Sequence, residues 1–505
     1  MDRTDLTCLA DSPWLAARLA AAGLSAAAVE AKVGLFAHCA EALRDAGVAP
    51  DAAARALFVP GRIEVLGKHT DYAGGSSLVA APERGVCLVA ADRDDATVRA
   101  FALQRHAVRG GLEHPPRKNE IPGPRAVGPQ THRARRLCGA VGLGDTAEFA
   151  VAENLVPTAG HWSNYPMTTA RRLARNFGGD LRGADVAFSS DLPVAAGMSS
   201  SSSLMVAFYL ALAAVNRLDR RAAYRENITS PESLAAYLGA VENGQTFGSL
   251  VGDKGVGTFG GSEDHTAMLC CRPGTLSQYA YCPTRPERTI PLPAGYTFAI
   301  ASSGIAAEKT GEAMAPYNRS SHLASAVAAA WRDATGRDDA TIADALASSD
   351  PDEAAERMRA ILAQLPAGSP FSAEELAARF EHFRAENVEI LPAAGDALAA
   401  GDLAEFRRQV DRSQRLAETL LGNQVPQTVF LARSARESGA AAASAFGAGF
   451  GGSVWAMVRE DEAEAFLENW AARYALAHTA EAAEASFFRT RPGPAAFNLA
   501  KGADS

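Results

Sequence analysis

The segment that most constrains the fold runs from residue 186 to residue 215. It opens with Val-Ala-Phe-Ser-Ser-Asp-Leu-Pro, passes through Gly197 and five serines, Ser199 to Ser203, and closes with an apolar run, Leu204 to Val215. The first part has the composition of a buried strand, and the last part has that of a buried helix. The sequence therefore predicts a strand, a glycine turn and a helix that begins among the serines.

This arrangement suits the binding of a phosphate group. A helix N-terminus presents several backbone N–H groups and a favourable dipole to an anion, and small residues let the anion approach the backbone. Serine hydroxyls can donate to phosphate oxygens or coordinate Mg²⁺. The segment is not a Walker A loop, because no Gly-Lys-Ser/Thr follows the glycine. A flexible serine linker is the alternative, and the apolar helix directly after the serines argues against it.

The rest of the chain predicts at least one further domain. A length of 505 residues exceeds what one ordinary core supports. Alternating or apolar runs predict strands at 57–66, 85–103, 296–302 and 453–458, and helical spacing predicts helices at 12–47, 318–332, 340–364, 372–400 and 402–420. We place the domain boundary near 285–295. Residues 104–140 are rich in Pro, Gly and basic side chains, which predicts an exposed loop or a partly disordered insertion.

Net charge and hydropathy argue against some classes of binding partner. The net charge of −9 disfavours a nucleic-acid binder. The longest apolar run, Leu204 to Val215, is too short to cross a bilayer, and the N-terminus has no apolar signal-peptide core. Seven scattered cysteines without a CxxC pair fit reduced thiols. We therefore expect a cytoplasmic monomer with no nucleic-acid or membrane partner.

Three separate motifs resemble those of one family. Pro60 to Gly75, which reads PGRIEVLGKHTDYAGG, resembles the N-terminal signature of galactokinases. Leu192 to Leu204 resembles the second, phosphate-binding motif of the GHMP kinase superfamily, and Phe446 to Ser453 resembles its third, Gly-rich motif. The motifs follow the family's order, and the resemblance covers most of residues 57–460.

The resemblance implies an α+β fold of two domains with the active site in the cleft between them. The N-terminal domain, residues 1–290, would be mixed and would carry the first two motifs and the insertion at 104–140. The C-terminal domain, residues 291–505, would be ferredoxin-like and would carry the third motif. The implied activity is transfer of the γ-phosphoryl group of ATP to the anomeric hydroxyl of galactose or a related sugar, with ATP and Mg²⁺ as cofactors.

The resemblance also implies roles for individual residues. Asp264, in the segment Gly260-Gly261-Ser262-Glu263-Asp264, would be the general base, and Arg62 would stabilise the charge that develops beside it. The groups implied to contact the sugar are Lys68, His69, Asp71, Gly261 and Tyr317. Those implied to contact ATP are Trp162, Tyr165, Gly197, Ser199, Ser200, Ser201, Ser202 and Ser203. Mg²⁺ would be held by Ser200 and Glu242.

The signature departs from the family pattern at two positions. Lys68 stands where galactokinases have glutamate, and Glu64 stands where they usually have asparagine. A lysine only donates hydrogen bonds and carries the opposite charge, so Lys68 would suit a sugar with a carboxylate, such as a uronic acid. The alternative is that Lys68 points to solvent or pairs with Glu64, and we rank a neutral hexose ahead of an acidic sugar.

Two other classes remain open from the residues. A non-catalytic relative would bind sugar and ATP as a sensor, and retention of Arg62 and Asp264 favours the enzyme. A GHMP kinase for a non-sugar substrate is disfavoured by His69-Thr70-Asp71-Tyr72, because this tetrapeptide belongs to the galactokinase branch.

Overall fold

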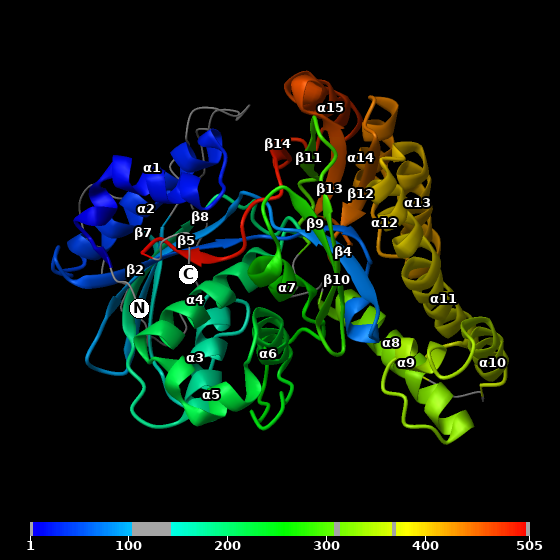
Figure 1. Ribbon diagram of the computed structural model, residues 1–505, viewed down its shortest axis with the longest axis horizontal. Coiled ribbons are helices and arrows are strands. Elements are labelled where there is room, and N and C mark those ends of the chain that lie inside the picture. The colour runs from blue at the N-terminus through cyan, green and yellow to red at the C-terminus, as the bar shows by residue number, and fades with distance from the viewer. Residues whose placement is uncertain (1–3, 104–142, 308–313, 366–369, 501–505) are drawn as a thin grey trace, which may run out of the picture.

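The computed structural model describes residues 4–103, 143–307, 314–365 and 370–500. The predicted insertion at 104–140 lies outside the described residues. The described chain forms three β-sheets and the helices packed around them, arranged as a left-hand and a right-hand part in Figure 1.

The first sheet has the strand order β1-β2-β5-β8-β6-β7, and β15 also pairs with β2. Neighbouring strands of this sheet are antiparallel, except for β6 and β8, which are parallel to each other. The strands are β1 (Thr4–Asp5), β2 (Ala53–Pro60), β5 (Gly85–Asp92), β6 (Thr97–Leu103), β7 (Leu143–Ala150), β8 (Ala184–Ser190) and β15 (Phe497–Asn498).

Helices cover both faces of the first sheet. Successive side chains of a strand point to opposite faces, so Leu57 and Val59 of β2 join one hydrophobic core and Phe58 joins another. The helices of the Phe58 side are α1 (Ser12–Ala21) and α2 (Ala26–Asp45). Those of the other side are α3 (Asn164–Phe177), α4 (Ser200–Val215), α5 (Ala222–Asn227), α6 (Pro231–Asn243) and α7 (Glu263–Cys270).

The second sheet connects the first sheet to the right-hand part. Its order is β10-β9-β4-β3, with β3 (Ile63–Leu66), β4 (Ser76–Ala80), β9 (Thr275–Ala280) and β10 (Arg285–Pro291). Ile63 and Val65 of β3 share one core with Ile390 and Trp455, which come from much later in the chain. The strand that carries the signature is therefore held by both parts.

The third sheet is ferredoxin-like, as predicted. Its antiparallel order is β12-β13-β11-β14, in which the last strand lies beside the first. The strands are β11 (Tyr296–Ser302), β12 (Ala442–Phe446), β13 (Ser453–Arg459) and β14 (Ser486–Thr490). Two helices, α14 (Pro426–Glu437) and α15 (Ala463–Ala477), pack against these strands.

A run of helices between β11 and β12 forms the right-hand edge of Figure 1. It comprises α8 (Met314–Thr335), α9 (Ile342–Leu346), α10 (Pro351–Ala363), α11 (Ala373–Arg384), α12 (Leu391–Ala400) and α13 (Leu403–Leu416). The single helix expected at 340–364 is two helices, because Asp350 caps a new helix at Pro351. A π-helical turn at Ala385–Ile390 joins α11 to α12.

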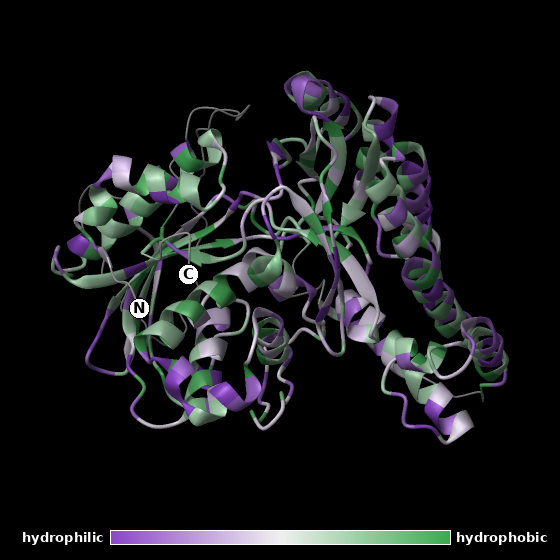
Figure 2. Cartoon of the chain, in the orientation of Figure 1, coloured by the Kyte–Doolittle hydropathy of each residue, from purple (hydrophilic) through white to green (hydrophobic). Residues whose placement is uncertain are grey.

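Hydrophilic residues alternate with hydrophobic ones along these helices, whereas the strands of the third sheet are coloured mainly as hydrophobic (Figure 2). None of the helices in the described residues is long and apolar enough to span a membrane. The end of the chain returns to the first sheet, where Phe497 pairs with Phe58. The domain boundary at 290/291 stays a prediction.

Candidate functional site

The signature turns sharply after β3. Gly67 has φ of 101° and His69 has φ of 56°, both in the left-handed region. A Cβ on Gly67 would lie 2.5 Å from Ser77 Cα, so only glycine allows the turn to pack against β4. The turn carries Asp71 to a small pocket whose other lining side chains come from β3, the end of α6, residues 260–265, α8 and the third Gly-rich motif.

This pocket brings together most of the predicted catalytic and sugar-binding residues. The predicted residues that line it are Arg62, His69, Asp71, Glu242, Gly261, Asp264 and Tyr317. The free space is about 40 Å³, well below the several hundred Å³ of a typical ligand site. A hexose therefore requires the lining side chains to move apart. We call this site the acidic pocket, because five carboxylates line it.

Arg62 is the centre of the acidic pocket. It is 4% exposed, and its Nε donates to Asp264 Oδ1 at 2.8 Å. Its Nη2 lies 2.5 Å from the same oxygen, and its Nε lies 3.1 Å from Glu263 Oε1. Nη1 donates to the carbonyl of Gly197 at 3.1 Å. One guanidinium thus joins two carboxylates to the predicted phosphate loop.

The predicted phosphate loop forms a helix N-terminus. Gly197 has φ of 72°, Ser199 precedes α4 with φ of 59°, and α4 starts at Ser200. The buried Ser199 hydroxyl has no hydrogen-bond partner among the described residues. Ser203 Oγ donates to the Pro60 carbonyl at 2.8 Å and so ties the helix to β2. The free N–H groups of the first turn of α4 and the Ser199 hydroxyl are suited to an anion.

Ser202, rather than the predicted Ser200, contacts the acidic residue Glu242. Ser202 Oγ donates to Glu242 Oε2 at 2.8 Å and lies 3.5 Å from Asp264 Oδ2. Five consecutive serines give the sequence no register, and each residue turns the side chain by about 100° around the helix. The position of each serine around the helix therefore decides which of them faces Glu242, and that serine is Ser202.

The donors around Ser202 fit Mg²⁺. The hydroxyl of Ser202 and the buried carboxylates of Glu242 and Asp264 are hard oxygen ligands. Within the described ranges, no group of three or more His, Cys, Asp or Glu side chains is placed to hold a metal alone. His265 Nε2 lies 3.2 Å from Glu242 Oε2, although it lacks hydrogen-bond geometry.

The third Gly-rich motif packs directly on the phosphate loop. A Cβ on Gly447 would lie 2.7 Å from the Gly197 carbonyl oxygen, so the two loops touch through backbone atoms. Ser453 Oγ donates to the Ala196 carbonyl at 2.6 Å. These contacts fix the C-terminal sheet against the start of α4.

The predicted sugar-binding residues already have protein partners. His69 Nδ1 lies 2.7 Å from Tyr72 Oη, and its Nε2 lies 3.1 Å from the Ala448 carbonyl oxygen. Asp71 Oδ2 accepts from the backbone N–H of Glu263 at 3.2 Å. A Cβ on Gly261 would lie 2.2 Å from Asp71 Oδ2, so glycine is required where the two segments meet.

The two predicted adenine contacts lie outside the acidic pocket. Tyr165 is 8% exposed and belongs to the core beneath α3. Trp162 is half-buried, with its ring centroid 5.2 Å from that of Phe188, and its Nε1 donates to Asp145 Oδ2 at 3.2 Å. Their role in binding adenine stays a prediction.

Lys68 does not contribute to the acidic pocket, which corrects its assignment to sugar binding. Its side chain is 1% exposed, and Nζ donates to Ser413 Oγ of α13 at 3.0 Å. Ser413 Oγ in turn donates to Glu386 Oε1 at 2.9 Å, and this oxygen also accepts from the N–H of Gly67 at 2.8 Å. Lys68 neither faces solvent nor lines the acidic pocket, and it supplies positive charge to a buried polar network.

This network includes residues of α11 and of the π-helical turn that were not predicted from the sequence. Glu386 is fully buried in the π-helical turn, and the neighbouring Asn387 accepts from the N–H of Ser76 at 2.7 Å. Arg379 of α11 donates to the His69 carbonyl oxygen. A Glu-Asn pair inside a predicted helix was the available signal, because polar residues that become buried need partners. The sequence could not say which partners.

Glu64 lines the acidic pocket and is 3% exposed. Burial raises the pKa of Glu64 from its ordinary value of 4.5 to about 7, against the opposite effect of Arg62 and Lys68. The folded protein therefore binds this proton more tightly than the unfolded chain. The stability that the proton contributes is complete below pH 4.5 and is lost as the pH rises to about 7.

Glu64→Gln is expected to raise the free energy of unfolding above pH 7 by up to about 3 kcal/mol, since one pKa unit is worth about 1.4 kcal/mol. At pH 5 the gain should be much smaller, because Glu64 is then protonated in the folded protein. Urea unfolding at pH 5 and pH 8 measures the difference, with the exposed Glu437→Gln as control. Equal gains at both pH values would contradict this account.

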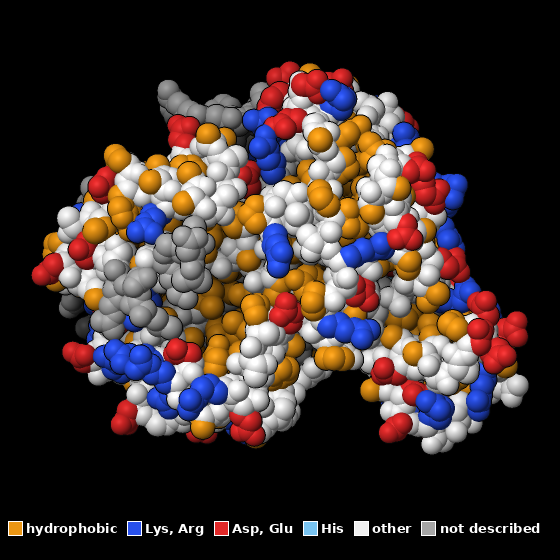
Figure 3. Space-filling view, in the orientation of Figure 1, with side chains coloured by type: hydrophobic (Ala, Val, Ile, Leu, Met, Phe, Trp, Pro, Cys, Tyr) orange, Lys and Arg blue, Asp and Glu red, His pale blue; other side chains and the backbone are white. Residues whose placement is uncertain are grey.

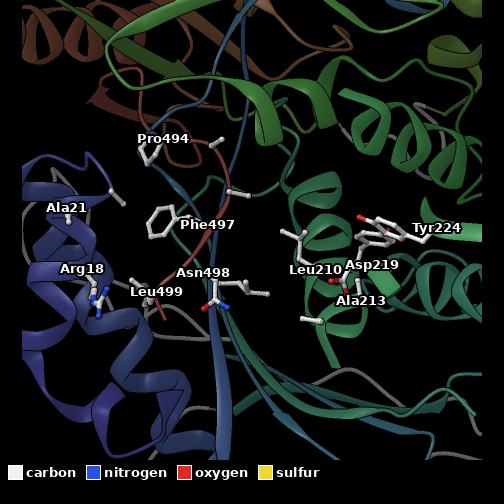
Figure 4. Close-up of a pocket in the computed structure, with 16 residues that line it drawn as sticks. Arg18, Ala21, Leu210, Ala213, Asp219, Tyr224, Pro494, Phe497, Asn498 and Leu499 are labelled. Atoms are coloured by element: carbon white, nitrogen blue, oxygen red, sulfur yellow. The ribbon is translucent and has the colours of Figure 1, made fainter. Parts of the chain in front are cut away.

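A cavity larger than the acidic pocket lies elsewhere among the described residues. It measures about 590 Å³ and is lined by residues of α1, α4 and the segment around β15 (Figure 4). Its wall is mainly apolar, with Arg18 and Asp219 as charged members. None of the residues predicted from the motifs lines it. On the face shown in Figure 3, apolar side chains also gather between the left-hand and right-hand parts.

Three family descriptions match the chain. Residues 164–249 match the GHMP kinases N terminal domain, and residues 396–476 match the GHMP kinases C terminal domain. Residues 47–92 match the galactokinase galactose-binding signature. The matched ranges contain β2 to β5 with the signature, α3 to α6 with the phosphate loop, and two strands of the ferredoxin-like sheet, β12 and β13.

Curated relatives and a solved structure agree with these matches. A galactokinase from Roseiflexus sp. (strain RS-1) is 28% identical over 85% of this chain and 88% of its own length. A galactokinase from Glaesserella parasuis serovar 5 (strain SH0165) is 24% identical over 84% of this chain and 90% of its own. The crystal structure of Lactococcus lactis galactokinase complexed with galactose has the same fold, with a TM-score of 0.66, 21% identity, and coverage of 90% of this chain and 99% of that one. The chain is therefore a galactokinase-like member of the GHMP kinase superfamily.

Proposed function

We propose that this galactokinase-like sugar kinase transfers the γ-phosphoryl group of ATP to the anomeric hydroxyl of galactose. The observation that carries the proposal is the contact of Arg62 with Asp264, 2.8 Å between Nε and Oδ1, beside the N-terminus of α4. Phosphoryl transfer depends mainly on positioning and on neutralising charge. A base, a cation and an anion-binding helix N-terminus within one site meet these needs.

Asp264 acts as the general base in this proposal. Its carboxylate accepts the proton of the attacking hydroxyl, and Arg62 beside it favours the ionised carboxylate. Arg62 also reaches the phosphate loop through the Gly197 carbonyl, so its charge lies between the base and the phosphate site. It is therefore placed to stabilise the charge on the group in transfer.

The phosphates of ATP bind at the first turn of α4, where N–H groups and serine hydroxyls converge. Ser202 and Glu242 hold Mg²⁺, with Asp264 close by. When bound, Mg²⁺ neutralises phosphate charge and orients the phosphates. Trp162 and Tyr165 are retained as the proposed adenine contacts.

Galactose is the proposed acceptor because residues 47–92 match a galactose-binding signature. His69, Asp71, Gly261 and Tyr317 hold its hydroxyls. A uronic acid is disfavoured as the acceptor. Lys68 lies outside the pocket, and a sugar carboxylate would meet like charges there.

Release of ADP with Mg-ATP and a panel of galactose, glucose and galacturonate tests the proposal. We expect turnover on galactose and none on galacturonate. Binding of ATP and galactose without ADP release would instead support the sensor class. Turnover on galacturonate alone would overturn both the choice of sugar and the reassignment of Lys68.

Gly261→Ala is expected to raise the KM for the sugar about tenfold, which is about 1.4 kcal/mol of binding. The new methyl group would overlap Asp71 Oδ2, so Asp71 must leave its position in the pocket. Gly34→Ala is the matched control, because a Cβ at Gly34 meets no atom within 4 Å. Steady-state kinetics with varied galactose measure the effect, and an unchanged KM would remove Asp71 from the sugar site.

A further inference from the structure

His69 has a backbone conformation that few residues other than glycine adopt. Its φ of 56° lies in the left-handed region, where the Cβ crowds the neighbouring carbonyl oxygen. Such strain persists only where the surrounding structure holds the residue. The ring of His69 lines the acidic pocket, with Nδ1 2.7 Å from Tyr72 Oη and Nε2 3.1 Å from the Ala448 carbonyl oxygen. These contacts orient the ring, and the backbone requires a contact of its own.

Arg379 of α11 supplies that contact. Its side chain is 1% exposed, and its Nη2 donates to the His69 carbonyl oxygen. Its Nε donates to the carbonyl oxygen of Ser320 on α8 at 3.4 Å, and its guanidinium carbon lies 5.8 Å from the centroid of the Tyr72 ring. One buried side chain therefore joins the signature turn to two helices.

The charge of Arg379 faces carbonyl oxygens rather than a carboxylate. Within the part of the chain that the structure describes, Arg379 forms no ion pair, and its Nη1 lies 3.4 Å from Nδ1 of the buried His382. Burial, followed by the charge of Arg379, lowers the pKa of His382 well below its ordinary value, so this imidazole is neutral. A buried guanidinium without a counterion is costly for the fold, which indicates a role other than stability.

We propose that Arg379 is a positioning residue for the sugar, because it holds His69 in the left-handed conformation that directs the ring into the acidic pocket. This inference rests on the proposed function and adds a residue to that site. Arg379 is not among the residues that line the pocket, so it acts through His69. Arg379 also binds the carbonyl of Ser320, a turn of helix after Tyr317. It thereby fixes α8 against the signature turn, where the ring centroids of His69 and Tyr317 lie 5.8 Å apart.

Steady-state kinetics of Arg379→Met tests the inference. We expect the KM for galactose to rise about tenfold or more, while the KM for ATP stays within about twofold of the original value. The reason is that the contacts of Arg379 within the described residues reach the sugar-binding turn but not the phosphate loop. Arg379→Lys keeps the charge and a donor for the His69 carbonyl, so its KM should return to within about threefold of the original. Arg408→Met, at an exposed arginine of α13, is the matched control and should change neither KM.

A double variant tests whether Arg379 acts through His69. His69→Ala removes the ring, so adding Arg379→Met to it should raise the KM for galactose by less than about twofold further. A full additional rise would overturn the proposal. So would a folded Arg379→Met protein with an unchanged KM for galactose, or with equal rises in the KM values for galactose and ATP.

The role of Arg379 and the proposed function can fail separately. If the original protein releases no ADP with galactose, the proposed function fails, and the calorimetric affinity for galactose replaces the KM in the same comparison. An affinity that Arg379→Met leaves unchanged then overturns the role of Arg379, and absence of any galactose binding overturns both. Circular dichroism checks folding. If Arg379→Met is unfolded, Arg379→Gln, which is neutral but polar, takes its place with the same expected rise.

Discussion

Replacing Asp264 with asparagine is expected to lower kcat by about 10²–10⁴-fold, the usual contribution of a general base. The amide has nearly the shape of the carboxylate but does not accept the proton of the sugar hydroxyl. Arg62 keeps its contact with Glu263, 3.1 Å from Nε to Oε1, so the fold should survive the change. ADP release measures the loss, and ATP binding by calorimetry should change little.

Two carboxylates touch Arg62, so the assignment of the base needs its own control. Glu263→Gln changes the neighbouring carboxylate in the same way, and it should leave kcat within about tenfold of the original protein. Asp396→Asn, at an exposed aspartate paired with Arg288, controls for the substitution itself. A large loss in Glu263→Gln with little loss in Asp264→Asn would exchange the two roles.

Much of this site was predictable because it is built from short contiguous segments. The strand at Tyr296–Ser302 and the helix that begins among the serines follow from local composition and period. The turn at Gly67 to Asp71 depends on a glycine and on residues with left-handed backbone, and the glycine is visible in the signature motif. These features need no knowledge of distant residues.

The remaining features depend on contacts between distant segments. Ser202 rather than Ser200 contacts Glu242 because of the phase of α4 against α6, which five identical residues conceal. Lys68 was assigned to the sugar because of its position in the signature. Its partner in the structure, Ser413, lies 345 residues away in the chain, so the sequence does not reveal that contact. A π-helical turn inserts one extra residue into a helix and re-aims Glu386, and helical periodicity does not reveal such a turn.

Lys68→Met is expected to lower the free energy of unfolding by about 3 kcal/mol, the upper end of the usual cost of leaving buried polar partners unsatisfied. Methionine fills similar space but leaves Ser413 without its donor and Glu386 without a nearby cation. Urea unfolding at pH 7.5 measures the change. Lys254→Met is the control, because Lys254 is an exposed lysine.

A second substitution separates charge from packing. If Lys68 acts by balancing Glu386, then Glu386→Gln in the Lys68→Met background removes the uncompensated charge and should recover at least 1 kcal/mol, roughly the coupling seen between groups of one polar network. If Lys68 matters only for its volume, the two losses should add. Because Glu386 also accepts the N–H of Gly67, the same network sets the start of the signature turn. Recovery in the double variant would make Lys68 a positioning residue for that turn, although the sequence placed it against the sugar.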